Sequence, residues 1–166
     1  MNTLWHEVWR GVQSDFADLP GVAEVTQIVL RLLLAALLGG LLGFEREQVG
    51  RAAGLRTHML VALGAGFFVM VPYLAGMPLG DLSRVLQGII AGVGFLGAGT
   101  ILKRQTEEQI EGLTTPAGLW LTAAVGTAAG MGREASAVLG TVLAFLILAL
   151  LPRLYSRKSY GNKIDS

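Results

Sequence analysis

The sequence predicts an all-α polytopic membrane protein with five transmembrane helices, because apolar composition and long uncharged stretches occur together. Of the 166 residues, 52% are hydrophobic and only 15% are charged, whereas about 25% are charged in soluble domains. A helix needs about 20 mostly apolar residues to cross the hydrocarbon. Five stretches meet this need: 25–44, 57–76, 85–102, 113–132 and 135–152. Arg31, in the first stretch, is the one charged residue in the five.

Residues 1–22 precede the spans and are predicted to form an amphipathic helix at the membrane interface. Apolar residues recur there at intervals of three or four, which is the spacing of one helix face: Trp5, Trp9, Val12, Phe16 and Leu19. Tryptophan suits the headgroup boundary. A helix packed on the outer rim of the protein explains the pattern equally well. Acidic residues interrupt the segment and it lacks a basic start, so we do not expect a cleavable signal.

The five spans form one domain over 23–152, and a basic cytoplasmic tail is expected over 153–166. Lys and Arg are unevenly divided between the two sides of the predicted membrane, nine against three. The side with nine contains the 45–56 and 103–112 connections and the tail. Because Lys and Arg favour the cytoplasmic side, we expect both connections and the C-terminus in the cytoplasm, and the N-terminus outside.

Spans one and two resemble spans three and four after a shift of 58 residues. Identical residues then align in one cluster: Leu38 with Leu96, Gly39 with Gly97, Arg46 with Arg104, Gly54 with Gly112, Leu55 with Leu113, Thr57 with Thr115, Leu63 with Leu121 and Ala65 with Ala123. The match predicts two copies of a helical hairpin. An even number of spans per copy makes the copies parallel, about an axis along the membrane normal.

Both connections end in the motif Gly-Leu-x-Thr. Thr57, and Thr114 or Thr115, can N-cap the next helix, which brings a partial positive charge to the membrane surface. Together with Arg51, Arg56, Lys103 and Arg104, such helix ends can hold an anion, such as a lipid phosphate or an acidic group of a partner. Ordinary capping and positive-inside charge account for the same residues.

Closely spaced small residues predict close packing of helices. The third span carries a series of glycines: Gly88, Gly92, Gly94, Gly97 and Gly99. The pairs Gly39/Gly43 and Gly126/Gly130 repeat the spacing of four in the first and fourth spans. Small residues let helix backbones approach each other in lipid. The pattern leaves open whether this packing lies within one chain or between protomers of a homo-oligomer.

Polar residues within the spans are few. Arg31 is a functional candidate because it is ionisable and intramembrane, although it can also snorkel to the outer interface, toward Glu24 or Asp81. His58 starts the second span and is expected to be a capping or interface residue. The spans hold no Asp or Glu, and the chain has no Cys and no catalytic or metal-binding motif. We expect no enzyme activity, cofactor, bound metal or nucleic-acid partner. A dedicated ion pump is disfavoured, but a pore lined by carbonyls and hydroxyls such as that of Thr100 remains open.

The ordered motifs resemble those of the MgtC/SapB family of bacterial inner-membrane proteins. The resemblance rests on Arg31 with LLLAALLGGLLGFERE, then GRAAGLRTH, QGIIAGVGFLGAGTIL and GLTTPAGLWLTAAVGTAAGMG, over about residues 31–132. It carries these family positions over to the chain: Arg31, Glu45, Arg46, Gly50, Arg51, Gly54, Leu55, Arg56, Thr57, Gly88, Gly94, Phe95, Gly97, Gly99, Gly112, Leu113, Thr114, Thr115 and Trp120.

The resemblance implies a role in magnesium homeostasis, virulence and stress adaptation. It implies a regulator that binds other inner-membrane proteins, the ATP synthase among them, as well as the lipid bilayer. Long members add a soluble C-terminal domain, which we expect this short member to lack. The expected function is therefore non-enzymatic modulation of membrane proteins, with a small magnesium transporter or channel as the alternative. The candidate binding residues are Arg31, Glu45, Arg46, Arg51, Arg56, Thr57, Thr114 and Thr115.

Overall fold

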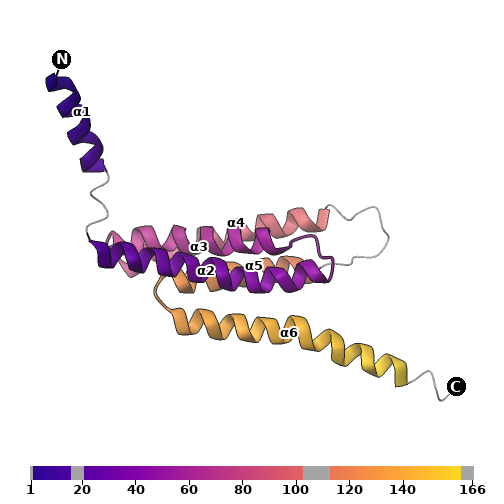
Figure 1. The fold of residues 1–166 in the computed structure, drawn as a ribbon. Coiled ribbons are helices and arrows are strands. Elements are labelled where there is room, and N and C mark those ends of the chain that lie inside the picture. The colour runs from indigo at the N-terminus through magenta and orange to yellow at the C-terminus, as the bar shows by residue number, and fades with distance from the viewer. Residues whose placement is uncertain (1, 16–20, 103–112, 162–166) are drawn as a thin grey trace. The chain divides into compact units, whose positions relative to one another are not determined.

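The computed structural model describes residues 2–15, 21–102 and 113–161, and these residues contain six helices and no strand. The helices are α1 (Asn2–Asp15), α2 (Val22–Gln48), α3 (Leu55–Leu74), α4 (Leu79–Leu102), α5 (Thr114–Gly130) and α6 (Glu134–Gly161) (Figure 1). The predicted all-α class is confirmed. The predicted 103–112 connection lies outside the described residues.

The chain divides into two compact units, residues 1–30 and residues 31–166. The first unit holds α1 and the beginning of α2. The tryptophans of α1 are exposed, Trp5 by 71% and Trp9 by 62%. A helix therefore exists over Trp5, Trp9 and Val12, whereas Phe16 and Leu19 of the predicted stripe lie outside the described residues. The location of the helix at the membrane interface stays a prediction.

Four helices, α2, α3, α4 and α6, are long and apolar enough to cross a membrane. Each covers one predicted span, with ends that differ by a few residues. The fifth predicted span coincides with α5, whose 17 residues stand at the lower end of the range of about 17–25 for a transmembrane helix. It packs against α3, α4 and α6, so much of its surface faces protein.

Small residues join α2 to α3 and fix their antiparallel direction. A Cβ atom added at Gly39 would lie 2.6 Å from the Cβ of Ala62, and one at Gly43 would lie 2.8 Å from the Cα of Leu55. As the residue number rises along α2, the number of the contacting residue in α3 falls, so the two helices are antiparallel. Any larger side chain at these glycines would force the two backbones apart.

The backbones of α3 and α5 approach each other closely, and these two helices run parallel. A side chain at Gly126 would overlap the backbone of Ala62, and one at Gly130 would overlap the backbone of Gly66. Both partners advance by four residues, so the seam is a small-xxx-small motif on each helix. Because α3 and α5 share a direction, α5 traverses the bundle as α3 does.

The packing of α4 on α5 repeats the packing of α2 on α3. A Cβ at Gly97 would lie 3.1 Å from the Cβ of Pro116, and one at Gly39 would lie 2.6 Å from the carbonyl oxygen of His58. Both members of the pair shift by 58 residues, the offset of the predicted repeat. The shared contact supports two copies of one hairpin.

Two clusters of small buried residues form the core. One contains Ala35, Ala62, Val125, Ala129 and Ala137. The other contains Ala53, Ala65, Val93, Leu119 and Ala123. Alanine dominates both clusters because close backbone approach, rather than bulky side chains, holds helices together in lipid.

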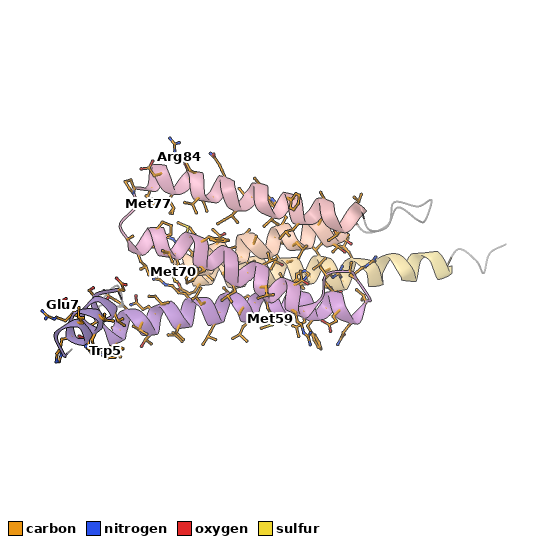
Figure 2. The ribbon with its side chains drawn as sticks, turned by 90° about the horizontal axis from the view of Figure 1, so that it is seen from above. Trp5, Glu7, Met59, Met70, Met77 and Arg84 are labelled. Carbon is orange, nitrogen blue, oxygen red and sulfur yellow. The ribbon has the colours of Figure 1, made fainter. Side chains whose placement is uncertain are left out.

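Three helices end in the same glycine cap. Gly50, Gly76 and Gly132 follow α2, α3 and α5 with φ of 68°, 78° and 70°, a conformation that costs glycine little. In each, the glycine N–H and the next N–H donate back to carbonyls three and five residues earlier, as in the Schellman motif. Figure 2 shows Met77, beside one of these caps, with Arg84 at the opposite end of the bundle from Met59.

Candidate functional site

Most of the predicted binding residues lie at one end of the bundle, which we call the loop end: residues 45–58 and the first turn of α5. Arg46 is its most buried charged residue, with 4% of its surface exposed. Its Nε atom pairs with Oε2 of the neighbouring Glu45, and its Nη2 atom donates to the carbonyl oxygen of Leu148 in α6 at 3.3 Å. Arg46 therefore ties α2 to α6.

The carbonyl of Leu148, which accepts from Arg46, lacks a hydrogen-bond donor within its own helix, and the sequence shows why. Within a helix, the carbonyl of Leu148 would accept from the N–H of residue 152, but residue 152 is proline and has no N–H. α6 continues through Pro152 to Gly161. Arg46 supplies the missing donor, so the arginine and the proline form one structural unit.

Glu47, rather than a threonine, caps α3. Its Oε2 atom accepts the N–H of Leu55 at 2.7 Å, and the N-cap residue Gly54 makes no side-chain cap. The prediction that Thr57 caps this helix is wrong, because Thr57 is already the third residue of α3. The helix begins at Leu55, two residues before Thr57. The carboxylate that caps it belongs to Glu47, at the end of α2.

The predicted threonine cap of α5 is also wrong. The N-cap residue is Leu113, which makes no side-chain cap hydrogen bond, and Thr114 and Thr115 are the first two helical residues. Thr114 is exposed, whereas Thr115 is 3% exposed. Thr115 is therefore buried inside the bundle at the start of α5.

His58 is fully buried at the loop end, with 0% exposed, so the prediction of an interface residue is wrong. Its Nδ1 atom lies 3.0 Å from the carbonyl oxygen of Gly54. Its Nε2 atom has no hydrogen-bond partner among the described residues and faces Gly118 on α5. Gly43 and Gly118 leave room for the imidazole ring. Because these two glycines are far apart in the sequence, a local sequence pattern does not predict that His58 is buried.

Arg31 lies at the other end of the membrane-spanning part of α2. Its Nε atom is 3.7 Å from Oε1 of Glu134, in the first turn of α6, and its guanidinium lies against Gly132. The expected partners were Glu24 and Asp81, but Asp81 pairs with Arg84 at 3.9 Å. Arg31 and Arg46 thus hold α6 at two levels, in an order that makes α2 and α6 parallel.

The glycines of α4 divide into one that packs within the chain and several that do not. Gly97 meets Pro116. A Cβ added at any of the other four glycines of the predicted third span would meet nothing within 4 Å among the described atoms: Gly88, Gly92, Gly94 and Gly99. Packing of these four within the chain is not observed, and packing against another protomer stays a prediction.

Two grooves flank α4. One, of about 720 Å³, lies between α3 and α4 and has walls that include Leu60, Phe68 and Leu96. The other, of about 360 Å³, lies between α4 and α5 and is lined by small residues and Trp120. In the described part of the chain, no group of three His, Asp or Glu side chains is placed to hold a metal ion. The hydroxyl of Thr100 donates to the carbonyl of Gly97 at 2.8 Å.

The family model described as "MgtC family" matches residues 32–157, which include the loop end, the contact of Arg46 with Leu148 of α6, and both grooves. The chain belongs to the MgtC family. The resemblance carried by the ordered motifs is therefore confirmed, and with it a multi-pass inner-membrane protein. No solved structure matches the chain.

Several known bacterial proteins are similar to this chain in sequence. Protein SrpB of Synechococcus elongatus is 45% identical over 75% of this chain and 74% of its own length. The "Putative magnesium transporter YhiD" of Escherichia coli is 39% identical over 82% of this chain and 66% of its own. Protein MgtC of Brucella abortus is 48% identical over 87% of this chain and 54% of its own. The chain thus spans about half of the length of the Brucella relative.

Proposed function

We propose that this MgtC-family protein is a non-enzymatic modulator of other inner-membrane proteins, active in adaptation to low magnesium or to stress inside a host. The proposal rests on family membership and on one structural observation. The α4–α5 groove is a recess that the described chain leaves open, with the small residues Gly94, Ala98 and Ala117 in its lining. Such a surface suits close approach of a helix from a membrane partner.

Crosslinking in native membranes tests the proposal. A photo-crosslinking residue at Ala98 is expected to capture another inner-membrane protein. The matched control is Ala91, an exposed alanine of the same helix that lines neither groove. In a deletion strain at low magnesium, Ala98→Leu is expected to lose complementation, whereas Ala91→Leu keeps it. Capture of nothing but the protein itself, with equal growth of both variants, would refute modulation through this groove.

A second candidate is a small magnesium transporter or channel, and the name of the Escherichia coli relative YhiD favours it. This function predicts magnesium flux into liposomes that contain the purified protein, with reduced flux for Arg31→Ala or Thr100→Val. Both residues have intramolecular partners, Glu134 and the Gly97 carbonyl respectively. A flux equal to that of empty liposomes, from protein with native helix content, would leave modulation as the function.

A further inference from the structure

The α3–α4 groove has an almost wholly apolar lining, part of which consists of glycines without side chains. Gly64 of α3 and Gly88 and Gly92 of α4 line it, and a Cβ at any of them would meet nothing within 4 Å. Thr57 carries the one polar side chain in the lining. The groove is therefore shaped for a thin apolar occupant.

The length of the groove separates two kinds of occupant. Its lining runs from Thr57 to Phe68 on α3 and from Val85 to Leu96 on α4. At about 1.5 Å per residue, each wall is roughly 16 Å long, which is about half of the roughly 30 Å hydrocarbon core. A partner's transmembrane helix would run the full thickness, whereas an acyl chain of one leaflet runs half of it. The length therefore favours a lipid chain.

The end of the groove at Thr57 carries positive charge. Arg56 is exposed and belongs to none of the ion pairs among the described residues. The first turn of α3 adds the partial positive charge of a helix N-terminus. The N–H of Leu55 donates a hydrogen bond to the carboxylate of Glu47. The backbone N–H groups of Arg56 and Thr57 have no acceptor within the helix, so they can donate to a ligand.

We infer that the α3–α4 groove binds an anionic phospholipid, with one acyl chain along Gly88 and Gly92 and the phosphate held by Arg56 and Thr57. The apolar lining, the one-leaflet length and the cationic end point to the same ligand. This inference does not depend on the proposed function, because the α4–α5 groove lies on another side of α4.

Native mass spectrometry of the detergent-purified protein tests the inference, with phosphatidylglycerol and phosphatidylcholine as probes. The wild type is expected to retain one phosphatidylglycerol in preference to phosphatidylcholine. Arg56→Gln is expected to weaken phosphatidylglycerol about tenfold, the scale of one lost charged contact, and to abolish the headgroup preference. Arg84→Gln is the matched control, because Arg84 is exposed at the other end of the bundle (Figure 2).

A groove-filling variant tests the seat of the acyl chain. Gly92→Leu places a side chain in open space within the groove and is expected to reduce retention of both lipids. Gly99→Leu, also in open space but in neither groove, is expected to leave retention unchanged. Equal losses in Arg56→Gln and Arg84→Gln would overturn the inference. So would displacement of the lipid by inorganic phosphate alone, or a Gly92→Leu variant that changes the oligomeric state and not lipid retention.

Discussion

At the scale of single residues, three of the charged side chains at the loop end make contacts within the protein. Glu45 pairs with Arg46, Arg46 satisfies a carbonyl that Pro152 leaves free, and Glu47 caps α3. These three residues are engaged by the chain itself. Arg56 remains exposed, which is why it, among the arginines of this end, is the residue we assign to an external ligand.

The link between Arg46 and Pro152 predicts a measurable coupling. Arg46→Gln is expected to lower the free energy of unfolding by about 3 kcal/mol, since it strands a buried carboxylate and a carbonyl. Pro152→Ala restores the N–H that Leu148 lacks. In that background, Arg46→Gln is expected to cost measurably less, as a double-mutant cycle detects. Additive effects in thermal or denaturant unfolding would show that the two residues act separately.

At the scale of helices, the sequence predicts the elements well and their ends and partners less well. The five predicted spans coincide with α2 to α6 because hydrocarbon thickness dictates both length and polarity. The ends differ because Glu47, rather than a threonine, caps the start of α3, and because glycines end α2, α3 and α5. The burial of His58 and the pairing of Arg31 with Glu134 depend on contacts between distant helices, which no local pattern contains.

The parallel α3–α5 seam is expected to be the most sensitive contact between helices. Gly126→Ala adds one methyl group against the backbone of Ala62 and is expected to cost about 1–3 kcal/mol, the range for overpacking. Gly88→Ala is the matched control, since its methyl group enters open space and alanine favours the helix. Melting temperatures in detergent compare the two variants. A Gly126→Ala variant as stable as Gly88→Ala would mean that the seam tolerates separation.

At the scale of the whole molecule, helix directions and charge asymmetry together predict orientation. α2 and α6 run one way, α3 and α5 the other, so the chain alternates through five crossings. The chain has no cysteine, which makes single introduced cysteines clean reporters. A membrane-impermeant maleimide is expected to label Ser83→Cys in intact cells and Gln48→Cys only after permeabilisation, both positions being exposed. The reverse pattern would place the loop end outside.

The α3–α5 seam also has a consequence for synthesis. Its two halves are separated in the chain by the whole of α4, so Ala62 and Gly66 must wait until Gly126 and Gly130 have been made. Until then, the small-residue face of α3 is open to lipid, and α3 is held by its contacts with α2 and α4 alone. A ribosome that stalls within α5 therefore leaves an unfinished bundle in which Ala62 and Gly66 of α3 have no α5 backbone against them.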